Sequence, residues 1–114
     1  MVSNKVIKNK EIAVLDRERK GILIHKDQLK AGPFKIGDRF SIKIGKVELF
    51  TLTIVKDDNG EILFDKDGIL IRRTRRIDML LGGIFDEYIL EIEPEKPNTI
   101  VVKPLQVVME NEIL

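Results

Sequence analysis

The stretch GILIRRTRRIDMLLGGIF, residues 68–85, carries the main clue to how this chain is built and the main clue to what it contacts. Its first four residues repeat the tetrapeptide GILI of residues 21–24, and four arginines follow within five positions. The positions of the arginines in space depend on the fold that the repeat implies.

The repeated tetrapeptide belongs to a longer pattern that occurs twice along the 114 residues. Each copy follows an apolar run that ends in aspartate, and each precedes a short helical candidate. The other matching pairs are AVLD (13–16) with ILFD (62–65), IGDRFSIKI (36–44) with IFDEYILEI (84–92), and TIV (53–55) with residues 99–101. Four ordered matches at nearly constant separation predict a duplicated unit of strand, loop, strand, helix, strand and strand.

Alternating apolar and polar residues predict strands over 40–44 and 49–55, each with one buried face. Because only GKVE separates the two runs, they are expected to form a hairpin. Asn59-Gly60 then predicts a tight hairpin turn with positive φ, and EILF at 61–64 begins another strand.

Two segments have the pattern of short helices. Residues 25–31 have room for two turns before Gly32-Pro33 ends them. Residues 72–81 form the longer candidate, which is ended by Gly82-Gly83 and has an apolar stripe of Ile77, Leu80 and Leu81.

Each repeat, at about 45 residues, is too small to bury both faces of its strands alone. We therefore expect repeats 12–56 and 61–104 to interleave into a single domain, a mainly β barrel with pseudo-twofold symmetry and two short helices. A closed barrel also removes the exposed edges that isolated hairpins would leave. The tail, residues 105–114, is either a last strand or a short docking segment, and packing on the barrel is favoured.

Composition excludes several classes of protein. The 20 basic and 19 acidic residues leave a net charge of +1, so any site for a polyanion must arise locally. The absence of cysteine removes disulfides and thiolate ligands, and no apolar run approaches the ~18 residues of a membrane span. Charges interrupt the N-terminal residues where a signal peptide would be apolar. These features predict a soluble cytoplasmic protein with no membrane contact.

No set of residues in the sequence suggests catalysis. There is no glycine-rich phosphate loop, no Ser-His-Asp set and no carboxylate pair with interpretable spacing. His25 is the one histidine and has no second histidine to help hold a metal. Residues 57–61 have the composition of a calcium loop without its regular ligand positions. We therefore expect no enzyme activity, no cofactor and no metal.

Residues 14–44 and 63–104 each resemble the AbrB-type swapped-hairpin family, which includes MazE-like antitoxins and SpoVT-type regulators. The shared pattern is an aspartate-containing turn, a glycine, a β-branched strand, a short helix, and a Gly-Asp turn into an alternating strand. Gly37-Asp38 supplies the last element in the first copy, whereas Phe85-Asp86 keeps only the aspartate. Having both copies on one chain is similar to the MraZ-type arrangement. The resemblance implies a swapped-hairpin barrel that binds double-stranded DNA.

The chain departs from this family at two places. The family usually has Arg or Lys after the turn glycine, where it helps to contact DNA, whereas this chain has Ile22 and Ile69. The family also has an Ile-Pro pair entering the helix, and no proline precedes either helical candidate here.

The second copy supplies the first candidate DNA contacts, Arg72, Arg73, Arg75 and Arg76. On a helix over 72–81, three of these arginines would face away from Ile77 and Leu81. Forked guanidinium donors suit phosphates and base edges. The alternative is a solvated face that is neutralised by the acidic residues Asp86, Glu87, Glu91, Glu93 and Glu95.

The first copy offers Arg17, Arg19 and Lys20 in its turn and Lys26 and Lys30 in its helix. The resemblance implies that basic residues of this turn and helix approach the DNA grooves, whereas alternating charge can also simply keep a turn solvated. We expect the pseudo-twofold axis to place the basic clusters of the two copies on related faces.

The leading hypothesis is a DNA-binding transcription regulator that uses these basic loop and helix residues. The first alternative is a protein-interaction module, an antitoxin-like or scaffold barrel without DNA binding, acting with a protein partner or as a homo-oligomer. A barrel that binds a small molecule is the third hypothesis, and it requires a concave pocket with converging polar groups.

Overall fold

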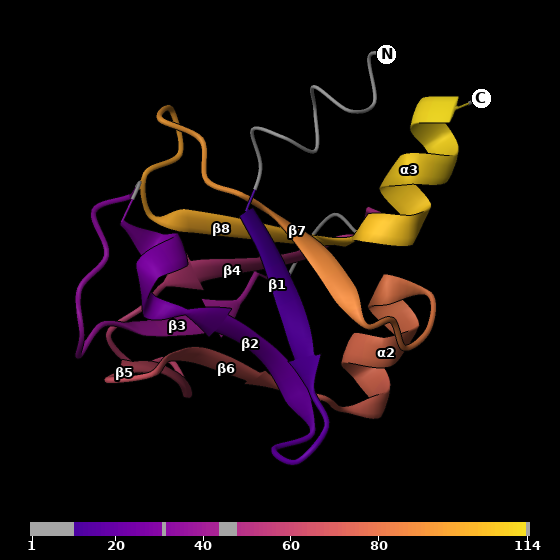
Figure 1. The fold of residues 1–114 in the computed structure, drawn as a ribbon. Coiled ribbons are helices and arrows are strands. Elements are labelled where there is room, and N and C mark those ends of the chain that lie inside the picture. The colour runs from indigo at the N-terminus through magenta and orange to yellow at the C-terminus, as the bar shows by residue number, and fades with distance from the viewer. Residues whose placement is uncertain (1–10, 31, 44–47, 114) are drawn as a thin grey trace.

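The computed structural model describes residues 11–30, 32–43 and 48–113, with side chains described as far as residue 109. It is a closed antiparallel barrel of eight strands, which confirms the predicted mainly β barrel (Figure 1). The strands are β1 (Glu11–Asp16), β2 (Gly21–His25), β3 (Arg39–Ile42), β4 (Leu52–Lys56), β5 (Ile62–Asp65), β6 (Gly68–Arg72), β7 (Glu87–Glu91) and β8 (Thr99–Pro104). The helices are the 3-10 turn η1 (Lys26–Leu29), α2 (Arg75–Leu81) and α3 (Leu105–Ile113).

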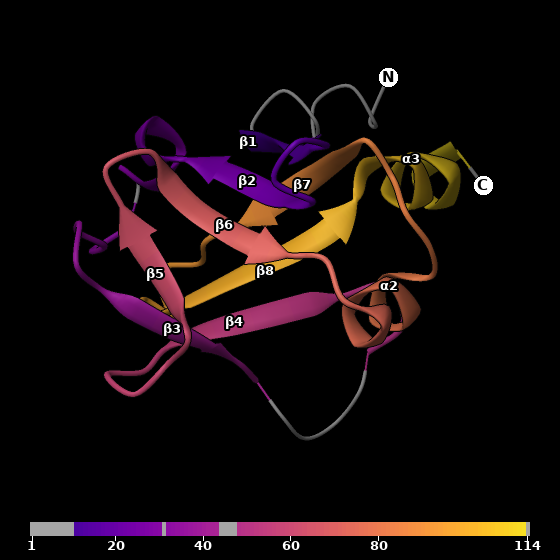
Figure 2. The same ribbon diagram turned by 90° about the horizontal axis from the view of Figure 1, so that it is seen from below.

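The two halves of the chain interleave around the barrel. Its strand order is β1-β2-β6-β5-β3-β4-β8-β7, so the hairpin β1–β2 lies between β7 and β6 of the other half. The hairpin β5–β6 in turn lies between β3 and β2 of the first half, and Figure 2 shows β2 and β6 side by side. Exchanging each first-half strand for its second-half counterpart leaves this order of neighbours unchanged.

Strand register shows where the pseudo-twofold axis crosses the barrel. Between β2 and β6, Leu23 lies opposite Leu70, and the flanking pairs mirror one another on either side. On the other wall, Ile54 of β4 lies opposite Ile100 of β8. The pairing therefore has the symmetry that a duplicated sequence predicts, and gene duplication is our interpretation of it.

Alternate residues of the strands fill the barrel, as the period-two pattern predicts. The buried interior is formed by Ile22, Ile24, Phe40, Leu52, Ile54, Phe64, Ile69, Ile71, Tyr88, Leu90, Ile100 and Val102, with Ala13 of β1. Tyr88 occupies the position that Phe40 has in the first copy, and its hydroxyl oxygen accepts a hydrogen bond from Phe85 N at 3.1 Å. Burial raises the pKa of the Tyr88 hydroxyl, since the phenolate would lose its hydration.

The aspartate that ends the first strand of each copy organises the following turn. Asp16 Oδ1 accepts hydrogen bonds from the backbone N–H of Glu18 and of Arg19, both at 3.1 Å. Asp65 Oδ1 accepts from Asp67 N at 2.8 Å and from Gly68 N at 3.2 Å. A short carboxylate of this kind stabilises a turn by accepting from backbone N–H groups that have no ladder partner.

The prediction for Asn59-Gly60 is wrong in two respects. Positive φ values in the described residues occur at other positions, and β4 and β5 do not pair with each other but flank β3 on opposite sides. The turn closes through Gly60 N, which donates to Asp57 O at 2.8 Å. Glycine is required at position 60 because a Cβ would lie 2.1 Å from Phe40 O.

The predicted helix over 72–81 begins too early. Arg72 is the last residue of β6, and α2 begins at Arg75 because Thr74 Oγ1 accepts a hydrogen bond from Ile77 N at 3.2 Å. Gly82 ends α2 with φ +80°, as predicted. The candidate at 25–31 is a single 3-10 turn capped by His25, whose Nδ1 accepts from Asp27 N at 3.2 Å.

The C-terminal tail is a helix, so the last-strand alternative is wrong. Helix α3 follows Pro104 directly and packs against β7 and β8, which confirms the favoured packing on the barrel. Over the described stretches, no helix has the length and apolar character needed to cross a membrane.

Candidate nucleic-acid interface

Basic residues from both copies meet at one end of the barrel. Gly21 lies opposite Arg72 in the β2–β6 ladder, and Arg73 N donates to Lys20 O at 2.8 Å. The β1–β2 turn therefore adjoins the junction between β6 and α2. We call this surface the arginine end, and it comprises Arg17, Arg19, Lys20, Arg72, Arg73, Arg75 and Arg76. The two clusters were expected on related faces, whereas the structure joins them on one.

Lys26 and Lys30 lie apart from the arginine end. Their helix η1 follows His25, which lies opposite Gly68 at the other end of the β2–β6 ladder, and Figures 1 and 2 show η1 and α2 on opposite sides of the barrel. Lys30 Nζ is 3.4 Å from Asp27 Oδ1. The prediction that these lysines share one patch with the arginines is therefore wrong.

Three of the arginines at this end have carboxylate partners. Arg17 pairs with Asp86, and Arg73 Nε lies 3.3 Å from Asp78 Oδ2. Arg19 Nε is 3.3 Å from Asp16 Oδ2, and its Nη1 is 3.7 Å from Asp67 Oδ2. Exposed pairs of this kind contribute little to stability, but they orient the side chains.

Arg72, Arg75, Arg76 and Lys20 are exposed and have no ion-pair partner within the described residues. Two of the five predicted neutralising carboxylates have other partners, since Asp86 pairs with Arg17 and Glu91 pairs with Lys103 at 3.0 Å. Arg72 comes from the end of β6, whereas Arg75 and Arg76 begin α2. The three arginines were predicted to share one helix face, whereas they lie on a surface formed by the end of a strand and the start of a helix.

An apolar hollow lies beside these arginines. Leu49, Arg75, Arg76, Met79 and Leu80 line it, and its volume is about 540 Å³. Leu49 is 79% exposed and Met79 is 74% exposed. We call this feature the α2 hollow. The sequence reasoning missed it, although Met79 lies outside the apolar stripe of α2 and was the available signal.

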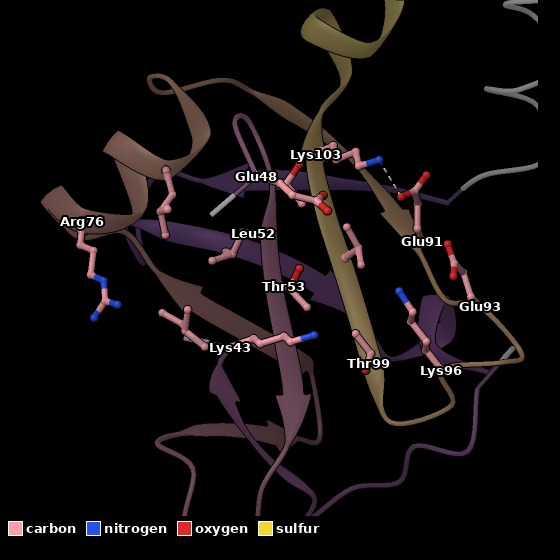
Figure 3. Close-up of a pocket in the computed structure, with 14 residues that line it drawn as sticks. Lys43, Glu48, Leu52, Thr53, Arg76, Glu91, Glu93, Lys96, Thr99 and Lys103 are labelled. Carbon is pink, nitrogen blue, oxygen red and sulfur yellow. Dashed lines mark ion pairs between the residues drawn. The ribbon is translucent and has the colours of Figure 1, made fainter. Parts of the chain in front are cut away.

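A neighbouring groove of about 540 Å³, which shares Arg76 and Leu80 with the α2 hollow, runs along the outer face of β4 and β8 (Figure 3). Its lining mixes the cations Lys43, Arg76, Lys96 and Lys103 with the carboxylates Glu48, Glu91 and Glu93 and the hydroxyls Thr51, Thr53 and Thr99. Figure 3 shows Lys43 and Lys96 extending toward Thr53 and Thr99 from opposite sides. Because both signs of charge alternate here, the groove does not extend the arginine end as a uniform site for a polyanion.

The two isoleucines that follow the turn glycines, Ile22 and Ile69, are buried in the barrel. Ile22 and Ile69 both belong to the core, and the β2–β6 ladder places them opposite Ile71 and Ile24. These positions contribute packing and offer no contact to a ligand outside. The described residues also contain no group of histidine and acidic side chains that could hold a metal ion.

No protein-family model, curated protein or solved structure matches the chain.

Proposed function

We propose that this chain binds double-stranded DNA through the arginine end, as an AbrB-like regulator of transcription. The observation that supports the proposal is the set of three exposed guanidiniums, Arg72, Arg75 and Arg76, without carboxylate partners in the described chain. Folding does not require these side chains, because Ile71, Ile77 and Leu81 provide the inward contacts of the same segment.

The proposed contacts divide into two kinds. Arg72 and Lys20 lie on neighbouring backbone segments and are suited to phosphates, which supply most of the affinity for DNA. Arg75 and Arg76 project from the first turn of α2, where their forked donors suit base edges such as those of guanine. The ion pairs of Arg17 and Arg73 hold the adjoining turn and helix in place.

Fluorescence anisotropy with labelled duplexes from the gene's own neighbourhood tests the proposal. Replacing Arg72, Arg75 and Arg76 together by alanine is expected to weaken binding at ~50 mM salt by tenfold or more, and to lower the slope of log K against log salt by about 1, the share of the one phosphate contact at Arg72. The matched control replaces Lys26 and Lys30 at the opposite end and is expected to change affinity by less than about twofold. Undetectable binding at low salt, or equal binding by the arginine variant, would contradict the proposal.

The second candidate function is a protein-interaction module without a DNA role. It is favoured by the carboxylate partners of Arg17, Arg19 and Arg73, and by the buried Ile22 and Ile69 at positions where the resembling family has basic residues. Purification of the intact chain from its source with a stoichiometric protein partner, together with no retardation of DNA, would favour this function over the first.

A further inference from the structure

We infer that the α2 hollow is a docking site for an acidic amphipathic helix of a partner protein, and that occupation of the hollow excludes DNA. The second part rests on the proposed function, because the helix and the DNA would both need Arg75 and Arg76. The first part stands on the lining of the hollow alone.

Two of the three apolar side chains that line the hollow, Leu49 and Met79, are not needed by the barrel, whereas the third, Leu80, packs partly against the core. Helix α2 already buries Ile77 and Leu81, whereas Met79 is 74% exposed and Leu49, across from it, is 79% exposed. Adjacent large apolar side chains left in water, beside a concave surface, are typical of a site that a partner covers. Methionine suits such a site because its flexible thioether adapts to the surface placed on it.

The walls of the hollow are held in place before any partner arrives. Phe50, next to Leu49, has φ +58°, and its N–H donates to Leu80 O at 3.1 Å. The Phe50 ring lies against Gly82, where an added Cβ would be 2.3 Å from Phe50 Cε1. Leu49 and Leu80 are therefore joined through a fixed backbone contact, and little ordering is required for binding.

The charge around the hollow defines the partner. Arg75 and Arg76 line it, no carboxylate of the described residues does, and the one acidic residue of α2, Asp78, pairs with Arg73. A ligand that fills the hollow must therefore bring apolar side chains with carboxylates beside them. An amphipathic helix presents this combination, with leucines three and four positions apart and glutamates next to them. Arginine and methionine are also enriched where proteins meet.

Competition follows from the position of the arginines. Arg75 and Arg76 line the hollow, whereas Arg72 lies on β6 and does not. A bound acidic helix would pair with the two α2 guanidiniums and bring its own negative charge toward the DNA phosphates. Substitutions can therefore separate the two ligands. Changes at Met79 or Leu49 should weaken binding of the helix alone, and a change at Arg72 should weaken binding of DNA alone. Changing Arg75 together with Arg76 should weaken both.

The experiment uses the full chain and a synthetic helical peptide with leucines at i, i+3 and i+4 and glutamates between them. A scrambled peptide of the same composition is the control. Peptide binding and displacement of a labelled duplex are followed by anisotropy. We expect Leu49→Ser or Met79→Ser to weaken peptide binding at least tenfold and to change DNA affinity by less than about twofold. Arg72→Ala should show the reverse, and the Arg75→Ala, Arg76→Ala double variant should weaken both.

Each outcome distinguishes the two proposals. Equal binding of the scrambled peptide, or no peptide binding, overturns the docking site while DNA binding stands. Peptide binding without displacement of DNA overturns the exclusion alone. Failure of the wild-type chain to bind DNA overturns the proposed function and the exclusion, whereas the docking site is still judged by the loss of peptide binding in Leu49→Ser. Retention of wild type on anionic phospholipid vesicles, with loss in Met79→Ser and no peptide binding, replaces the partner helix by a membrane surface.

Discussion

At the scale of single residues, backbone conformation and burial are expected to change the free energy of unfolding more than side-chain charge does. Gly82 has φ +80° and lies under the ring of Phe50, whereas Gly37 has φ +102° with nothing within 4 Å of an added Cβ. The two glycines therefore separate the cost of the left-handed conformation from the cost of a steric clash. Tyr88 differs from its counterpart Phe40 by one hydroxyl group, whose oxygen accepts a hydrogen bond from the backbone.

Gly82→Ala is expected to lower the free energy of unfolding more than Gly37→Ala does. Both variants carry the strain of positive φ, about 1–3 kcal/mol, but only the first places a methyl group against Phe50. Urea denaturation of the two variants and the wild type measures the difference. Equal losses would show that the Phe50 ring moves aside at no cost.

Tyr88 is expected to make stability depend on alkaline pH. Its folded-state pKa is raised by burial, so its contribution is fully present below the unfolded pKa of about 10 and is lost as pH rises through the folded value. Tyr88→Phe should remove this part of the decline, so the difference between wild type and variant should begin to change near the unfolded pKa of about 10 and grow as pH rises further. Unfolding free energies across this range are the measurement, and parallel curves would contradict the expectation.

At the scale of secondary-structure elements, the two helices that follow β2 and β6 differ although their repeats match. His25 is both the last residue of β2 and the cap of η1, so that helix begins at once. In the second copy, Arg73 and Thr74 intervene, and α2 starts after the cap at Thr74. This local difference places Arg75, Arg76 and Met79 on a seven-residue α-helix, whereas its counterpart in the first copy is the four-residue 3-10 turn η1.

Thr74→Ala is expected to destabilise the protein by ~1 kcal/mol, because Ile77 N loses the hydroxyl that accepts its hydrogen bond. The first turn of α2 should fray, and any ligand that uses Arg75 and Arg76 should bind more weakly. Thr74→Ser keeps the hydroxyl oxygen and should retain both properties. Chemical denaturation and ligand titration of the two variants test this, and equal behaviour of the two would contradict it.

At the scale of the whole molecule, neither half contains a complete barrel wall. The first hairpin of each repeat pairs with strands of the other repeat on both sides. Hairpin β1–β2, for example, pairs with β7 and with β6. The ladder between β2 and β6 is centred on Leu23 and Leu70, so each repeat contributes the same surface to the contact. The barrel closes only when both repeats are present.

Separate fragments 11–56 and 61–113 are therefore expected to be unfolded as monomers. Their mixture, or a dimer of one repeat, should recover the strand content, because the pseudo-twofold pairing allows one repeat to replace the other. Circular dichroism together with sedimentation measures folding and mass in the same sample. A fragment that unfolds cooperatively as a monomer would contradict the interleaved arrangement.

The sequence alone predicted the barrel, its strands and the repeated plan, because alternation of apolar residues and the aspartate turns are local patterns. It also identified the arginines that folding does not need. The mistakes concern long-range contacts: Arg72 was placed on a helix because its pairing with Gly21 is not visible in the sequence, and Lys26 and Lys30 were grouped with the arginines.

Only the tertiary structure decided where the candidate sites lie. The hydrogen bond from Arg73 to Lys20 joins the basic residues of two repeats into one end, and the contact of Phe50 with Leu80 and Gly82 brings Leu49 beside Met79. Residues this far apart along the chain meet because barrel closure fixes their neighbours. Local periodicity therefore determined the elements of this protein, and the pairing between its halves determined which charges and apolar side chains share a surface.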